Sequence, residues 1–228
     1  MKLPVPLSLL AIVLMAWPAQ AQLSYTGGLL QQDFNSLPMA GAFDFMDVGL
    51  SNLKGPVQLA ASPVTATNAA GWSIYARVGS PMQFRIDNGN STTASAYSYG
   101  PVAGVDRALG SLGGSHVANL GWRLINNTGQ TITQFTLTYR GEQWRNGGSL
   151  NVNKLDFAYR ITSTLTTDID NSSSYTLVPA LDFTSPVSLA NGFALNGNSS
   201  ANRTEISATI SGINWANGQL LILRWRDT

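Results

Sequence analysis

The chain has 228 residues, only 11% of them are charged, and the net charge is +1. No run of lysine or arginine occurs, which argues against a nucleic-acid partner, because binding to a phosphate backbone needs a clustered basic face. Cysteine is absent and histidine occurs once, at His116. This argues against disulfides, a lipid-modified cysteine, thiolate metal sites and a zinc site of histidines.

Residues 1–21 predict export. A short positive start, Met1-Lys2, precedes an apolar run from Leu7 to Trp17, and Ala19-Gln20-Ala21 supplies the small-x-small signature of a cleavage site. The apolar run is too short to span a bilayer, and nothing comparable follows it. The sequence therefore predicts a signal peptide over residues 1–21 and a secreted or cell-surface chain over residues 22–228, without a membrane span.

The rest of the chain consists of short runs with period-two alternation, separated by clusters of Gly, Asn, Ser and Pro, and it has no helical periodicity of useful length. Many short strands without helices between them predict an all-β fold. We expect a single antiparallel two-sheet β-sandwich, jelly-roll-like in topology, with a closed barrel as the alternative. The predicted strands are 43–50, 56–61, 71–78, 82–86, 95–100, 116–126, 131–144, 150–161, 175–183, 203–211 and 219–226.

The runs 131–144 and 150–161 alternate most regularly. Their odd positions are apolar, as at Phe135, Tyr139 and Phe157, and their even positions are mostly polar. One face of each run is therefore expected to be buried and the other wet. If the two runs pair as a hairpin, both apolar sets must face one core, and a register with residue 144 opposite residue 150 satisfies this.

The same parity places Trp144 on the outer face beside Arg140 and Glu142, unless Gly141 forms a bulge and reverses the count. An outward indole next to charged groups predicts a sugar platform, on which the ring stacks against a pyranose. The candidate ligand-binding residues are Arg140, Glu142, Trp144, Arg145 and Asn146. In the alternative interpretation a neighbouring loop covers Trp144 and Glu142 pairs with Arg140 or Arg145, since large aromatic side chains are usually buried.

The segment Gly141-Glu142-Gln143-Trp144-Arg145-Asn146-Gly147-Gly148 resembles part of an uncharacterised β-sandwich domain of bacterial secreted proteins. Nearly all of the mature chain shares the resemblance. The other matching segments are residues 32–38 (QDFNSLP), 106–111 (DRALGS), 126–130 (NNTGQ) with 135–137 (FTL), 179–186 (PALDFTSP) and 223–227 (LRWRD).

The resemblance implies an exported module. That domain occurs in proteins with a PEP-CTERM-type sorting signal and at the front of larger secreted proteins, some with nuclease- or phosphatase-like domains. Its members continue past the Trp-Arg-Asp element into a glycine-rich loop and a strand with paired aspartates. This chain stops at Thr228, so we expect a domain truncated at its C-terminal strand, with an edge left exposed.

Calcium is the expected inorganic ligand, if there is one, because it binds carboxylate and carbonyl oxygens and stabilises many extracellular sandwiches. Asp33 is the candidate ligand, and Asp168 with Asp170 is a second candidate. Neither site has EF-hand spacing, and ordinary turn aspartates are the alternative. No other cofactor is expected.

The sequence does not predict an enzyme. A glycosidase needs two carboxylates about 5–9.5 Å apart, and no spacing places the only glutamates, Glu142 and Glu205, or Asp156 together. A serine triad would have to use His116, which has no Gly-x-Ser-x-Gly motif nearby.

We therefore expect a non-catalytic exported module for binding or surface display, with an extracellular polysaccharide or envelope component as partner. The first alternative is an accessory N-terminal domain of a secreted hydrolase, nuclease/phosphatase-like or carbohydrate-active. The second is a carbohydrate-active enzyme that uses Glu142.

Overall fold

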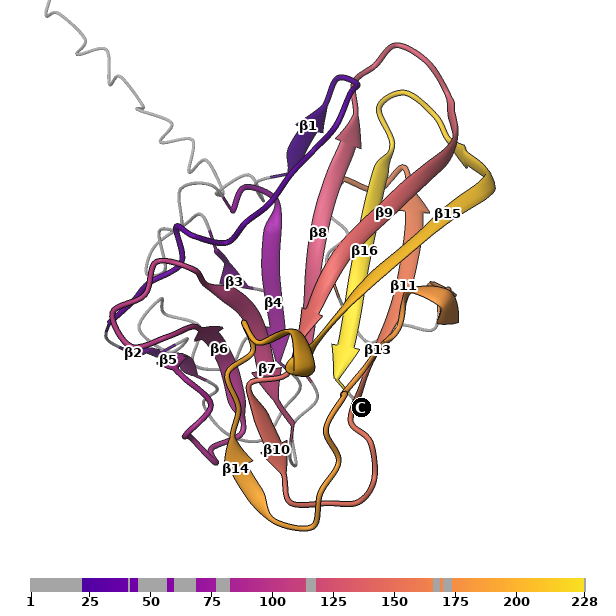
Figure 1. Cartoon of the computed structure of the whole chain (residues 1–228). Coiled ribbons are helices and arrows are strands. Elements are labelled where there is room, and N and C mark those ends of the chain that lie inside the picture. Colours follow the sequence, from indigo (N-terminus) through magenta and orange to yellow (C-terminus); the bar gives the residue numbers. More distant parts are fainter. Residues whose placement is uncertain are drawn as a thin grey trace, which may run out of the picture.

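The structure is a computed structural model that describes residues 22–40, 42–44, 57–59, 69–76, 83–113, 118–165, 169 and 174–227. In these ranges the chain is all-β, with two short 3₁₀ helices, η1 (Pro179–Leu181) and η2 (Ser200–Asn202) (Figure 1). The predicted all-β sandwich is confirmed, and the jelly-roll topology stays a prediction. The expected signal peptide, His116, Asp168 and Asp170 lie outside the described residues.

The largest sheet has eight strands among the described residues. They are β1 (Leu23–Tyr25), β3 (Val57–Gln58), β4 (Trp72–Ala76), β8 (Ala118–Asn126), β11 (Lys154–Thr162), β12 (Thr176–Leu177), β13 (Phe183–Thr184) and β16 (Leu220–Asp227). The order is β12-β11-β16-β8-β4-β3, while β13 also pairs with β11 and β1 lies parallel to the end of β8. We call this the main sheet.

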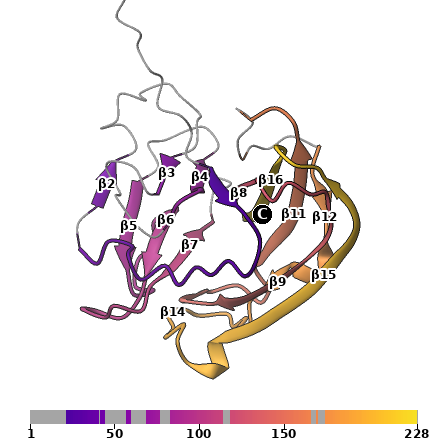
Figure 2. The same cartoon turned by 90° about the horizontal axis from the view of Figure 1, so that it is seen from above.

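The remaining strands form three smaller sheets. They are β2 (Ala42–Asp44), β5 (Gln83–Asp87), β6 (Ser95–Tyr99), β7 (Ala108–Leu112), β9 (Ile132–Glu142), β10 (Arg145–Gly147), β14 (Gly192–Ala194) and β15 (Arg203–Trp215). One sheet has the order β2-β5-β6-β7, and the two others are the pairs β9–β15 and β10–β14. From above, the four-stranded sheet lies on one side of the molecule and the β9–β15 pair on the other, with β8 between them (Figure 2).

The main core lies between the main sheet and the β9–β15 pair. Three tryptophans on the inner face of the main sheet stack: Trp72 lies 5.2 Å from Trp122 and 5.5 Å from Trp225 between ring centroids. From the opposite layer β9 contributes Phe135, Leu137 and Tyr139, and β15 contributes Ile206, Ile210, Ile213 and Trp215. The alternation of β9 and β15 therefore buries one face of the pair and leaves the other exposed.

Strand β16 is buried on both faces. Leu221, Leu223 and Trp225 belong to the main core, whereas Leu220 and Ile222 belong to a second cluster on the other side of the sheet. A nearly continuous apolar run is what such a strand requires. β16 pairs with β11 on one side and with β8 on the other, so it is not an edge strand.

The predicted hairpin of 131–144 with 150–161 is wrong. β9 pairs with β15, and β11 pairs with β16, so the two runs lie in different layers. Phe135, Tyr139 and Phe157 nevertheless face one core, as predicted. The reason is that parity fixes only which side chains meet the core, and two strands facing each other across a sandwich satisfy it as well as a hairpin does.

Candidate functional site

Residues 141–148, which we call the clasp, lie where β9 leaves the β15 pair and the chain crosses to β10. β9 ends at Glu142, residues 143 and 144 are outside any strand, and β10 then pairs with β14. The period-two count that predicted the outer face stops applying at this point. The clasp therefore has to be interpreted from its contacts and not from its parity.

Trp144 is buried, and its expected role as an outer-face sugar platform is wrong. Only 5% of the residue is exposed. Its ring stacks on Tyr99 at 6.0 Å, and Tyr99 stacks on Tyr97 at 4.8 Å. The loop at Gly197 also covers the indole, so closely that a Cβ atom there would be 2.4 Å from Nε1 of the ring. The alternative that a neighbouring loop covers Trp144 is confirmed.

Glu142 contacts this buried indole. The Trp144 Nε1–H donates to Glu142 Oε2 over 3.1 Å, where the alternative interpretation expected an ion pair with Arg140 or Arg145. Burial raises the pKa of the Glu142 carboxyl, and Asp106 raises it further, while the indole hydrogen bond and the Arg203 charge lower it. Glu142 is thus a half-buried acceptor at the edge of the aromatic stack.

Arg145 and Asn146 fasten the clasp to two neighbouring loops. Arg145 Nη1 donates to the carbonyls of Gly89 and Asn90 in the turn between β5 and β6, over 3.1 and 3.3 Å. Asn146, only 1% exposed, donates through Nδ2 to the Leu189 and Asn191 carbonyls and accepts from the Leu189 N–H. Both predicted ligand-binding residues are thus engaged in contacts within the chain.

The sequence interpretation missed Gln143. Its Nε2 donates to the Val187 carbonyl over 2.8 Å, and its Oε1 accepts from the Val187 N–H over 2.8 Å. The side chain thereby replaces a partner strand for one residue of the 185–189 segment. A polar residue that follows directly on the end of an alternating run is a weak sequence signal for such a role.

A row of solvent-facing polar side chains lies on the outer face of β9–β15. This polar face consists of Gln134, Thr136, Thr138 and Arg140 from β9, and Glu205, Ser207, Thr209 and Ser211 from β15. The strand register sets them directly opposite each other in pairs. Thr136 and Thr209 share a hydrogen bond of 2.8 Å, and Thr138 and Ser207 share one of 2.7 Å. The face is a ladder of hydroxyls.

Charged residues form one end of the polar face. Arg140 lies opposite Glu205 and Glu142 lies opposite Arg203, so the charges alternate. The Arg140 and Glu205 side chains approach to 3.8 Å and are 51% and 70% exposed. The register thus brings the two glutamates to diagonal positions of the strand pair, whose Cβ atoms are typically about 7–8 Å apart. Sequence spacing could not show this.

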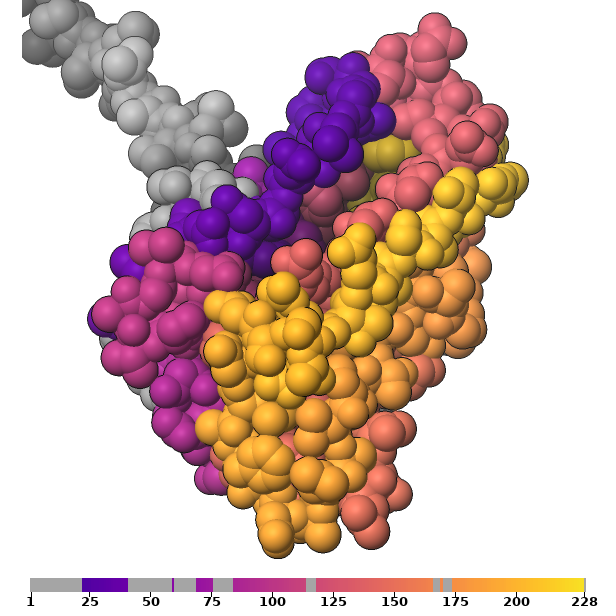
Figure 3. All heavy atoms as spheres, viewed as in Figure 1, coloured from indigo at the N-terminus to yellow at the C-terminus, as the bar shows by residue number. Residues whose placement is uncertain are grey.

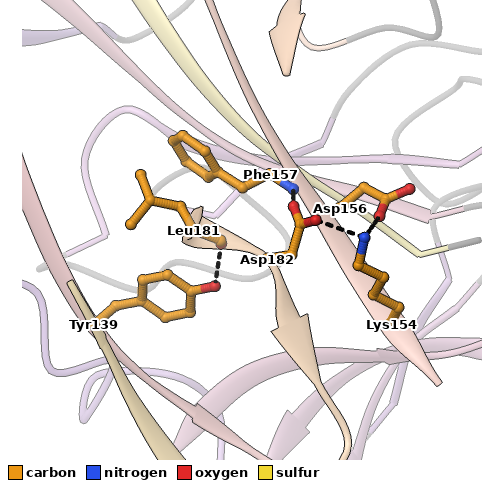
Figure 4. Close-up of polar contacts among 6 residues, drawn as sticks. All are labelled: Tyr139, Lys154, Asp156, Phe157, Leu181 and Asp182. Carbon is orange, nitrogen blue, oxygen red and sulfur yellow. Dashed lines mark hydrogen bonds and ion pairs between the residues drawn. The ribbon is translucent and has the colours of Figure 1, made fainter. Parts of the chain in front are cut away.

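Asp156, the third carboxylate considered for a glycosidase, lies in the main sheet and serves another contact (Figure 4). Lys154 Nζ lies 2.9 Å from Asp156 and 2.5 Å from Asp182, and the Phe157 N–H donates to Asp182 over 2.7 Å. Nearby, the Tyr139 hydroxyl donates to the Leu181 carbonyl over 2.6 Å, and burial raises the Tyr139 pKa to about 12. These contacts tie η1 and β13 to β11 and β9.

Asp33, the expected calcium ligand, accepts a hydrogen bond from the Asn35 N–H over 2.9 Å. That contact is the one made by an ordinary turn aspartate. Within the described ranges no three His, Cys, Asp or Glu side chains are grouped so that they could hold a metal ion. In the same part of the chain no helix is long and apolar enough to cross a membrane.

Comparisons with known proteins found no match to this chain. No family model matches the chain, and no curated protein or solved structure matches it either. The interpretation of the polar face therefore depends on its own chemistry.

Proposed function

We propose that the chain is a non-catalytic exported binding module whose polar face holds a hydroxyl-rich polymer, an extracellular polysaccharide. The single observation that carries the proposal is the ladder of paired hydroxyls on β9–β15, flanked by Gln134 and by the Arg140–Glu205 pair. Export and surface display are part of this proposal and rest on the pattern of residues 1–21.

The chemistry of the face suits a polysaccharide. A hydroxyl is both donor and acceptor, so each Thr or Ser engaged with its cross-strand partner keeps capacity for a further bond. Sugar hydroxyls have the same dual character. Arg140 adds donors and Glu205 adds acceptors, while their charges cancel across the pair. Such a face binds a neutral chain along the strands, with many weak contacts in place of one deep pocket.

The test is affinity electrophoresis and a glycan array with the mature chain and with Thr136→Val combined with Thr138→Val. Valine keeps the shape and the strand preference of threonine and removes the hydroxyl. We expect about a tenfold loss of affinity, since each lost hydrogen bond contributes about 0.5–1.5 kcal/mol. Thr176→Val, an exposed threonine on β12, is the matched control. Equal binding by the wild type, the double variant and the control would show that the polar face is not the binding surface. Absence of polysaccharide binding by the wild type would refute the proposed function.

The diagonal placement of Glu142 and Glu205 supports a second candidate, a carbohydrate-active enzyme. Diagonal positions on one face of a strand pair let two carboxyl groups reach the same bond, and burial raises the Glu142 pKa in the direction of a general acid. Against it, Glu205 is 70% exposed and Glu142 already accepts from an indole. Hydrolysis of chromogenic glycosides that is lost in both Glu142→Gln and Glu205→Gln would establish the enzyme.

A further inference from the structure

The end of the sandwich beyond the clasp carries four large exposed apolar side chains. Leu150 is 74% exposed, Val152 58%, Leu189 51% and Phe193 38%. Leu150, Val152 and Leu189 lie in two loops, residues 148–153 and 185–191, and Phe193 lies in β14, which follows the second loop. The loops meet at the bottom of the molecule beside β10 and β14. We call these four side chains the apolar tip. Exposed apolar side chains that gather in one place mark interaction sites more often than isolated ones do.

Hydrogen bonds hold the two loops side by side. The Asn153 N–H donates to Ser185 Oγ and the Ser185 N–H donates to the Asn153 carbonyl, both over 2.9 Å. Gly148, at φ +82°, lies so close to Gly192 that a Cβ atom would be 2.9 Å from the Gly192 nitrogen. The buried side chain of Asn146 bonds the second loop from inside. The loops therefore present the apolar tip on a fixed backbone.

The two segments that carry the tip contain no charged residue of their own, and the neighbouring Arg145 guanidinium, which lies beside Gly192, bonds the turn between β5 and β6. No Asp, Glu, Lys or Arg occurs in residues 146–153 or in residues 183–202. Charged side chains are expensive at a bilayer and are largely kept out of surfaces that enter one. Small polar residues, chiefly Asn, Ser and Gly, separate the apolar ones instead. This composition suits the boundary between lipid headgroups and acyl chains, where apolar side chains enter and neutral polar groups stay hydrated.

The end of the molecule that carries the tip projects from the rest. In the space-filling view the two loops form the protruding lower end of the molecule, and no hollow is visible between them (Figure 3). A protein partner would need a groove matched to this end, whereas a lipid layer adapts to any projecting side chains. We propose that the apolar tip inserts shallowly into the surface of a lipid bilayer and that zwitterionic lipid suffices. This goes beyond polysaccharide binding and uses a different surface.

The absence of cysteine makes the test direct. A single introduced cysteine, Leu150→Cys, is labelled with a polarity-sensitive dye in the otherwise intact chain. Vesicles of phosphatidylcholine are then added at low and high salt. The matched control is Leu177→Cys, which replaces a leucine that is 65% exposed and lies on β12 at the edge of the main sheet, a different sheet from β10–β14. We expect the emission of the Leu150→Cys conjugate to increase and shift to the blue, independently of salt, with no change in the control.

A second measurement checks the energetics without a label. Leu150→Ser combined with Leu189→Ser should weaken co-flotation with the same vesicles at least about tenfold, because each leucine loses its apolar transfer energy. Both residues are exposed, so the double variant keeps the wild-type fold, which circular dichroism verifies. An unchanged emission of the Leu150→Cys conjugate, or a change that follows protein concentration without vesicles, would overturn the proposal. The second result would identify the tip as a contact between copies of the chain.

Discussion

The polar face and the clasp are consecutive parts of one chain, and they use the same residue types in opposite ways. On the polar face Arg140 and Glu205 are exposed and form an ion pair with each other. In the clasp Gln143 and Asn146 are buried, and each polar atom bonds a backbone group of another loop. What separates the two is the end of β9 at Glu142. Inside a strand the backbone N–H and C=O groups form hydrogen bonds with the neighbouring strand. Outside a strand, side chains must supply the hydrogen-bond partners of these groups.

This comparison predicts that substitutions in the clasp destabilise the fold and that substitutions on the polar face do not. The largest effect is expected for Trp144→Ala. Removing a buried indole that stacks on Tyr99 leaves a cavity, and such changes typically cost about 3–5 kcal/mol. Urea unfolding monitored by circular dichroism measures it. A loss below about 1 kcal/mol would show that the stack contributes little.

A middle effect is expected for Asn146→Ala. The change leaves the Leu189 N–H and two carbonyls without their partner in a buried place, which costs about 1–3 kcal/mol. Hydrogen exchange should show faster exchange at residues 189–191 than elsewhere. If the exchange rates there match the wild type, the side chain does not fasten the loop.

The pH dependence is expected to be smaller and to have a definite sign. Burial raises the pKa of Glu142 and of Asp227 in the folded chain. Between the ordinary carboxyl pKa and the raised one, the folded state binds more protons than the unfolded state, so stability falls as the pH rises through that window and is level above it. Glu142→Gln should flatten part of this slope, because glutamine does not titrate. Its neutral amide oxygen can still accept the hydrogen bond from Trp144. The free energy of unfolding is measured by urea titration at a series of pH values. If its slope against pH is the same in Glu142→Gln as in the wild type, other groups cause the pH dependence.

The smallest effect is expected on the polar face. Arg140→Ala removes one partner of an exposed ion pair, which contributes about 0–1 kcal/mol. Unfolding curves should therefore nearly coincide with the wild type. A loss as large as that of Asn146→Ala would mean that the face is held as rigidly as the clasp, and the contrast between the two regions would disappear.

Strand positions could be predicted wherever alternation or an apolar run was long. β8, β9, β11, β15 and β16 fall within a few residues of the predicted ranges, because each buries at least one regular face. The run 175–183, expected as one strand, is instead β12, η1 and β13. Pro179 begins η1 and interrupts the ladder there, since proline offers no N–H to a neighbouring strand.

Strand pairing and the clasp could not be predicted for the same reason. β9 meets β15 about 70 residues later, and nothing in either sequence selects that partner over β11. The short strands β7, β10 and β14 have no regular alternation of polar and apolar residues. Each forms by pairing with an adjacent strand, β7 with β6 and β10 with β14. Of the five residues predicted as a patch, only Arg140 is openly exposed, because burial of the other four depends on loops whose positions the sequence does not state.

The place of β16 in the main sheet has a consequence for how the chain is made. β16 inserts between β8 and β11, both of which leave the ribosome well before it does. The central ladder therefore cannot close before β16 has been synthesised, and β8 and β11 wait with open edges. Long-range pairing of this kind is slow. Until β16 arrives, the open edges of β8 and β11 need protection from aggregation.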